Sequence, residues 1–216
     1  MKLVKKIKHI VFKKKKFKSS TSYWIERYRF AGNSGNGSYN KLAEFKGEIV
    51  NDFVLKHEIN SVIEFGCGDG NQLQYYNFKS YDGYDVSPDV IRKCKKLFKN
   101  DTTKRFHSMS QFTPKKADLS MSVDVIYHLV EDDIFNDYME KLFDASRKYV
   151  IIYSSNSSNH ENNGKAPHVR HREFTAWIEA NRSDFELIKH IPNRYPYNGI
   201  GEVSSYADFY LFRKVK

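Results

Sequence analysis

The chain has 216 residues, with 36 Lys+Arg against 26 Asp+Glu and only two cysteines, Cys67 and Cys94. This length suits one domain with a full hydrophobic core. Two cysteines argue against a disulfide scaffold and are typical of a reducing compartment, so we expect a cytoplasmic protein.

The net charge of +10 comes almost entirely from residues 1–20, which hold nine lysines and no acid. The rest of the chain is nearly neutral, so no nucleic-acid partner is expected. In residues 1–20 apolar side chains recur at roughly helical spacing among the lysines. This pattern favours peripheral contact with an anionic membrane surface, or equally a solvated tail or linker to a partner domain. No apolar run is long enough to predict a signal peptide or a membrane span.

Residues 21–57 are expected to form a lid and a helix. Gly32 to Ser38 is a polar, glycine-rich loop that follows a segment of tyrosine, tryptophan and arginine. Such a loop predicts either a plain linker or a lid over a ligand, and we favour a lid that closes through Tyr28, Ser34, Gly35 and Ser38. From Tyr39 to His57, apolar residues every three or four positions predict an amphipathic helix.

The most informative stretch is Ser61 to Pro88. An apolar run ending at Phe65 predicts a short buried strand, and glycines follow on alternate positions from Gly66 to Gly70. A second strand ends at Asp85, at the distance where a Rossmann-type unit places an acid on ribose hydroxyls. The alternative is a strand, turn and helix whose glycines serve only packing.

The acids in this stretch indicate the kind of ligand. Glu64 and Asp69 flank the glycine turn, where they would repel a phosphate and attract a cation. A ligand with a ribose at one end and a cationic amino acid at the other fits S-adenosylmethionine (SAM). At VIEFGCGDG and GYDVSP the sequence resembles class I SAM-dependent methyltransferases.

This resemblance implies an α/β, Rossmann-like fold with helices on both faces of a seven-stranded, mostly parallel sheet in the order 3-2-1-4-5-7-6. It makes residues 21–216 the methyltransferase domain and residues 1–20 a basic tail or linker. SAM is the implied cofactor and S-adenosylhomocysteine (SAH) the product. The residues expected to contact the cofactor are Glu64, Gly66, Cys67, Gly68, Asp85, Val86, Ser108, Met109 and Val123.

Two of these residues depart from the family pattern. Many members have an acid near the end of the third strand, which we expect at Arg105 to Met109, and that acid accepts a hydrogen bond from adenine. Ser108 is expected to bond adenine in its place, and Met109 to pack on the adenine ring.

The end of the predicted fourth strand, Ala117 to Val123, supplies candidate catalytic residues. In such sheets ligands bind beyond the carboxyl ends of the strands, where Asp124 and His128 follow. If this stretch is helical, the two share a face, and His128 can take a proton from an acceptor hydroxyl. The alternative for His128 is a buried structural histidine. Two candidate ligands are too few to predict a metal site.

A helix is predicted at Glu131 to Ser146 and a buried strand at Lys148 to Tyr153. The long polar loop that follows contains a run of histidines and arginines. We interpret it as an acceptor-binding loop with His171 as a second candidate base. The alternative is a solvated basic loop in which His171 starts a helix from Arg172 to Ala180. The residues concerned are His168, Arg170, His171 and Arg172.

These polar loops favour a sugar hydroxyl of a glycan as the methylated group. The segments VIYHLVED, YVIIYSSN and HVRHREFTAWIE resemble glycan (sugar O-) methyltransferases of bacterial or viral polysaccharide assembly. A glycosyltransferase domain or protein is the expected partner. Three alternatives remain open: a nucleic-acid methyltransferase, a small-molecule methyltransferase, and a non-catalytic SAM-fold partner of a glycosyltransferase.

Overall fold

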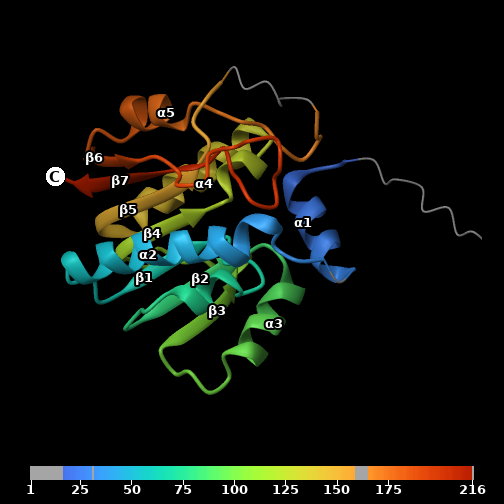
Figure 1. The fold of residues 1–216 in the computed structure, drawn as a ribbon. Helices are drawn as coiled ribbons and strands as arrows, with labels where there is room; N and C mark the ends of the chain where they lie inside the picture. Colours follow the sequence, from blue (N-terminus) through green and yellow to red (C-terminus); the bar gives the residue numbers. More distant parts are fainter. Residues whose placement is uncertain (1–16, 31, 159–164, 216) are drawn as a thin grey trace, which may run out of the picture.

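The computed structural model describes residues 17–30, 32–158 and 165–215, which fold around one seven-stranded sheet (Figure 1). The strand order is β3-β2-β1-β4-β5-β7-β6, as the resemblance implied. Neighbouring strands are parallel except where β7 pairs with β5 and β6. The strands are β1 (Val62–Phe65), β2 (Tyr81–Asp85), β3 (Lys104–Ser108), β4 (Ala117–Val123), β5 (Ser146–Ser154), β6 (Phe185–Ile191) and β7 (Asp208–Lys214).

Helices cover both faces of the sheet (Figure 1). Side chains of α2 and α3 share one buried cluster with the sheet, and those of α4 and α5 share the other. The helices are α1 (Ser20–Arg29), α2 (Asn40–Lys56), α3 (Pro88–Leu97), α4 (Asp132–Asp144) and α5 (Phe174–Asn181).

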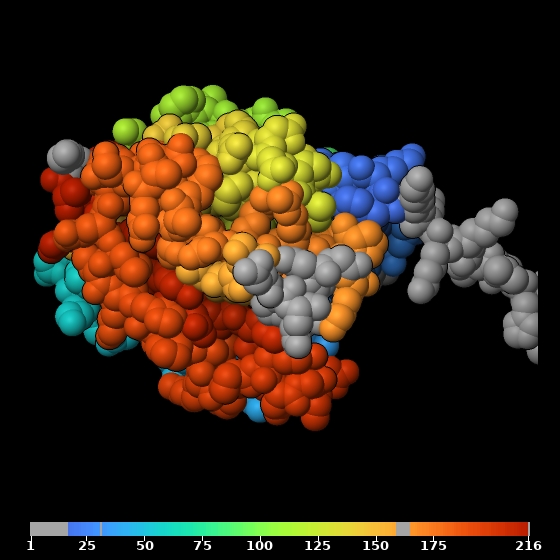
Figure 2. All heavy atoms as spheres, turned by 90° about the horizontal axis from the view of Figure 1, so that it is seen from above, coloured from blue at the N-terminus to red at the C-terminus, as the bar shows by residue number. Residues whose placement is uncertain are grey.

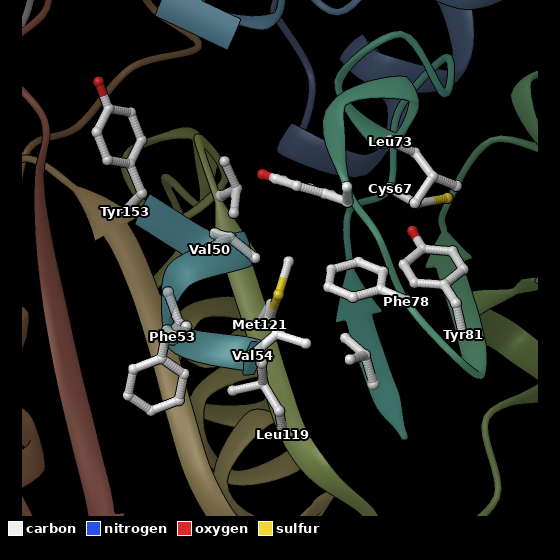
Figure 3. Close-up of a cluster of buried hydrophobic side chains, with 14 of the residues drawn as sticks. Val50, Phe53, Val54, Cys67, Leu73, Phe78, Tyr81, Leu119, Met121 and Tyr153 are labelled. Carbon is white, nitrogen blue, oxygen red and sulfur yellow. The ribbon is translucent and has the colours of Figure 1, made fainter. Parts of the chain in front are cut away.

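Alternation along the strands divides the core between the two faces. In β1, Val62 belongs to the cluster under α2 and α3, while Ile63 belongs to the cluster under α4 and α5. Figure 3 shows Val50, Phe53 and Val54 of α2 lying near Leu119 and Met121 of β4. Strands buried on both faces are expected of a mostly parallel sheet. Because the parallel strands run in the same direction, the loops that follow their carboxyl ends lie at one edge of the sheet, where ligands bind in such folds.

Helix α1 lies outside this layered core and is fastened by its first turn. The Ser19 side chain caps the helix, and the buried Ser20 donates its N–H and hydroxyl to the two carboxylate oxygens of Glu131 at 2.9 and 2.6 Å. The backbone N–H of Val130 in turn donates to Ser20 Oγ. The folded unit therefore begins before the expected boundary at residues 20 and 21. Residues 1–16, most of the lysine-rich segment, lie outside the described residues.

Two local expectations need correction. The residues after β4 form only a 3-10 turn (Ile126–His128), and Asp124 precedes it with a left-handed φ of 59°. Asp124 and His128 therefore do not share a helical face. Helix α5 begins at Phe174, later than the expected start at Arg172, because Arg172 is bonded to the segment before α4. Within the described residues, no helix is both long and apolar enough to cross a membrane.

Candidate cofactor and active site

The turn after β1 has a shape that only glycine permits at two positions. Gly66 has φ 82°, and a Cβ there would lie 2.4 Å from Cγ2 of Val125. Gly68 has φ 56°, and a Cβ there would lie 2.4 Å from Oγ of Ser34. The turn can therefore pack closely against both the segment after β4 and the lid loop.

Asp85 joins the glycine turn to the end of β2. Its carboxylate accepts hydrogen bonds from the backbone N–H of Gly68 at 3.1 Å and of Ser87 at 2.9 Å. Ser87 caps α3, and Pro88 occupies its first turn. Burial raises the pKa of Asp85 to about 6, against the opposing effect of these backbone donors.

These elements border a cavity of about 270 Å³ that is rich in acids. Glu64, Asp69, Asp85, Asp124 and Asp137 all line it, and among the described residues His128 is the only basic one in its wall. Such a site favours a cation and disfavours a phosphate. The other lining residues are Ser20, Thr21, Trp24, Tyr28, Ser34, Ser38, Gly66, Cys67, Gly68, Gln72, Val86, Met109, Val123, Val125, Leu129, Ile134 and Tyr138.

The loop before α2 closes over this cavity at Asp69. Ser34 donates its N–H to Asp69 Oδ2 at 3.3 Å, and Ser34 Oγ accepts from the N–H of Asp69 at 2.9 Å. The hydroxyls of Tyr28 and Ser34 lie 3.0 Å apart, and the hydroxyl of Tyr39 donates to Asp69 Oδ2 at 2.6 Å. The segment predicted to be a lid is thus bonded to the glycine turn.

Glu64 is buried at the end of β1 and accepts a hydrogen bond of 2.5 Å from the hydroxyl of Tyr81. Burial raises the pKa of Glu64 to about 7, although the Tyr81 hydrogen bond and the Lys46 charge act in the opposite direction. A cation bound beside Glu64 would favour its ionised form and release a proton.

Asp124 is held by a side chain from a distant helix. Lys46 of α2 is 0% exposed, and its ammonium donates to Asp124 Oδ2. The hydroxyl of Tyr127 donates to Asp124 Oδ1 at 2.8 Å. A left-handed φ at a non-glycine residue costs roughly 1–3 kcal/mol, so these contacts hold the carboxylate in a strained backbone position.

His128 has a defined tautomer. Its Nδ1 lies 3.1 Å from the carbonyl oxygen of His168, which can only accept, so Nδ1 carries the hydrogen and Nε2 keeps its lone pair. Trp24 of α1 packs edge-on against the imidazole at 4.8 Å between ring centroids. Burial lowers the pKa of His128 to about 4, so the side chain is neutral near pH 7.

Most of the residues expected at the cofactor line this cavity, but Ser108 does not. Ser108 instead pairs its hydroxyl with Ser110, and its N–H faces the side chain of Gln111. Cys67 is buried, and its pKa is raised by its contact with Cys94 and by burial, which fits a structural thiol.

The predicted acceptor loop does not act as one unit. Arg170 and Arg172 both pair with Asp132 and bond backbone carbonyls before α4, so the structure does not bring them to the cavity. His168 stacks on Tyr23 at 4.2 Å and holds His128 through its carbonyl oxygen. The buried His171 lies in the wall of a second cavity and not in the first.

Sequence reasoning missed several lining residues. Trp24 stands in a segment rich in aromatics, which was the one available signal. Ser20 and Thr21 carried no such signal, because their place depends on the bond to Glu131. Asp137 and Tyr138 lie in α4, where periodicity indicates only which side chains face inward.

The comparisons with known proteins agree with this geometry. Residues 63–148 match the model of a family described as a methyltransferase domain. This chain carries a SAM-dependent methyltransferase domain. Among curated proteins the comparison finds no match.

Several solved methyltransferase structures share the fold at low identity. The N-methyltransferase NodS from Bradyrhizobium japonicum, in complex with SAH, is 13% identical over 92% of this chain and 100% of its own, with a TM-score of 0.67. Magnesium protoporphyrin IX methyltransferase from Synechocystis, with bound SAH, is 14% identical over 90% of this chain and 96% of its own, with a TM-score of 0.60. The methyltransferase domain of bacterial CtHen1 is 19% identical over 79% of this chain and 97% of its own, with a TM-score of 0.60.

The residues of the first cavity fit SAM. Its wall combines the Asp85 carboxylate with further acids suited to a cationic sulfonium and ammonium, and it has no cluster of basic side chains among the described residues. The enzyme uses SAM as its cofactor.

Proposed function

We propose that this enzyme O-methylates a sugar hydroxyl of a glycan. The observation that carries the proposal is the position of Asp124, which lines both the acidic cofactor cavity and a second cavity with tyrosine, serine and histidine in its wall. A hydroxyl-rich acceptor finds hydrogen-bond partners in such a wall, whereas a flat aromatic or lipid acceptor needs a large apolar pocket.

Residues of the first cavity would hold the donor as follows. The carboxylate of Asp85 would accept hydrogen bonds from the ribose hydroxyls. The backbone of Gly66 to Gly68 would approach the methionine part of SAM closely. Val86 and Met109 would pack on the adenine. When bound, SAM supplies a sulfonium methyl group that passes to the acceptor oxygen and leaves SAH.

The residues of the chain would position the acceptor and move its proton. Asp124, fixed by Lys46 and Tyr127, would accept a hydrogen bond from the acceptor and orient its oxygen. His128 would take the hydroxyl proton at Nε2, which its neutral tautomer leaves available. Trp24 and the bonded lid loop would keep water away from the reaction.

The test is methyl transfer from isotopically labelled SAM to a panel of deoxysugar and capsule-type glycans, with products located by mass spectrometry. We expect the label on a sugar oxygen. His128→Gln should lower kcat more than it changes the dissociation constant for SAH. Label found only on nitrogen, carbon or nucleic acid would overturn the O-methylation of sugars while leaving the methyltransferase chemistry intact.

A further inference from the structure

We propose that the acceptor is held in the second cavity as a six-membered sugar ring, against an aromatic surface built by Tyr197 and Tyr206. This inference rests on the proposed function and adds the place and the shape of the acceptor. The sequence predicted that Arg170 and Arg172, before α5, bind the acceptor. We propose instead that residues of the connection between β6 and β7 bind it.

The second cavity has a volume of about 430 Å³ and adjoins the first at Asp124. Four segments far apart in the sequence form its wall: the start of α2 with the loop before it, the residues after β4, the segment before α5 and the β6–β7 connection. Figure 2 shows the segment before α5, in orange, and the β6–β7 connection, in red-orange, on one face of the molecule. The lining residues are Gly37, Leu42, Asp124, Tyr127, Lys165, Ala166, Val169, His171, Tyr197, Gly201, Ser204, Ser205, Tyr206 and Ala207.

The two tyrosines form one aromatic surface. Their rings stack with centroids 3.8 Å apart and planes inclined by 27°. Tyr197 is still 39% exposed, so part of its surface remains open to a ligand. Sugar rings present C–H groups on one face and hydroxyls around their edge, so an aromatic ring beside polar side chains matches them.

The connection that carries these tyrosines is held in shape before any ligand binds. Asn193 is buried and donates its side-chain amide to the hydroxyl of Tyr153 at 2.6 Å and to the carbonyl oxygen of Ala207 at 2.8 Å. Its backbone N–H donates to Asp208 at 2.8 Å, and the N–H of Ser205 donates to the carbonyl oxygen of Tyr195 at 3.0 Å. A preformed wall lowers the conformational entropy that the protein must lose when a ligand binds.

Polar side chains of the wall lie close to Asp124, where the hydroxyl to be methylated would bind. Tyr127 donates to Asp124, and its ring stacks near the imidazole of His171 at 5.8 Å. His171 is in turn hydrogen-bonded through Nδ1 to Ser155 Oγ at 2.6 Å. A hydroxyl near Asp124 lies beside the cofactor cavity, which is the position that methyl transfer requires.

The charges in this wall favour a neutral sugar over a phosphorylated acceptor. Among the described residues that line it, Lys165 is the only lysine or arginine, and Asp124 is the only acid. Arg170 and Arg172 are committed to Asp132 and backbone carbonyls and do not line the cavity. A phosphate group in this cavity would therefore be attracted by one lysine and repelled by the carboxylate of Asp124, and no arginine of the described wall would bind it.

The experiment is saturation-transfer NMR with a panel of methyl pyranosides on the SAH-loaded enzyme, for the wild type, Tyr197→Ala and Ile200→Ala. Ile200 lies in the same connection, is exposed and does not line the cavity, so its variant is the matched control. We expect at least one pyranoside to bind with SAH present, and Tyr197→Ala to weaken it about tenfold with unchanged SAH affinity. Ile200→Ala should bind as the wild type does.

Three results would overturn the inference: pyranosides that compete with SAH, equal binding by Tyr197→Ala and the wild type, or no binding by any pyranoside. The methylation assay separates this from failure of the proposed function. A glycan that is methylated with the same KM by Tyr197→Ala overturns the second cavity as its site but upholds sugar O-methylation. An acceptor without a sugar ring whose KM rises in Tyr197→Ala overturns both the sugar ring and the proposed substrate.

Discussion

The cofactor half of the site and the proposed acceptor half differ in where their supports come from. Asp85 is bonded to Gly68 and Ser87, within one strand–turn–strand unit. Asp124 is instead held by Lys46, 78 residues away in the sequence, and the second cavity also draws on residues 165–171 and 197–207. A local unit tolerates change elsewhere in the chain, whereas a wall assembled from remote segments depends on all of them. The following predictions test this difference, beginning with the largest expected effect.

Asp85→Ala should remove SAM binding most strongly. The variant loses both the carboxylate for the ligand and the backbone bonds that hold the turn, so affinity should fall on the order of 100-fold. Titration calorimetry with SAM and SAH measures it. Asp89→Ala is the control, because Asp89 lies in the same region but does not line the cavity. Unchanged affinity in Asp85→Ala would mean that the cofactor half is not organised around this acid.

Lys46→Met should destabilise the fold by about 1–3 kcal/mol, because it leaves the half-buried carboxylate of Asp124 without its counter-charge. Chemical denaturation measures the loss. Lys46→Met combined with Asp124→Asn should recover most of the stability but not the methyl-transfer rate, since the acceptor would still lack the carboxylate. If the double variant recovers both, the pair serves stability alone and the contrast between the halves weakens.

The affinity for SAM should rise about tenfold between pH 5 and pH 8. Over this range Glu64, with a pKa of about 7, and Asp85, with a pKa of about 6, lose protons that a bound cation must displace. Calorimetry in buffers of different ionisation enthalpy should detect proton release on binding. Glu64→Gln should leave only the lower step near pH 6. A SAM affinity that does not change with pH would contradict this role of the buried acids.

The raised pKa of Glu64 also makes the stability of the cofactor-free protein fall as pH rises, whereas the affinity for SAM rises. The folded protein holds this proton more tightly than the unfolded chain does, so the stabilising contribution is complete below the ordinary glutamate pKa. It is lost as pH rises through about 7. Denaturation of the cofactor-free protein at several pH values should show this loss through pH 7 in the wild type, whereas Glu64→Gln should keep only the loss through about pH 6 that Asp85 causes.

Ser34→Ala should have the smallest effect, a loss of SAM affinity of about five- to tenfold. It removes the hydroxyl that bonds Tyr28 and the N–H of Asp69, and each such bond contributes about 1 kcal/mol. Ser110→Ala is the control, because Ser110 bonds only the nearby Ser108 among the described contacts and lies outside the cavity wall. An equal loss in both variants would show that the lid loop does not contribute to holding the ligand.

The sequence alone determined the sheet order through its resemblance, and most elements through periodicity, as with the helix predicted from Tyr39 to His57, which is α2. It also determined the glycine turn and Asp85, because their geometry depends on residue spacing within one unit. Only the tertiary structure decided that Lys46 holds Asp124, that Arg170 and Arg172 serve Asp132, and that Tyr197 and Tyr206 line a cavity. These contacts join segments whose separation in the chain bears no relation to their distance in the fold, and no local pattern encodes them.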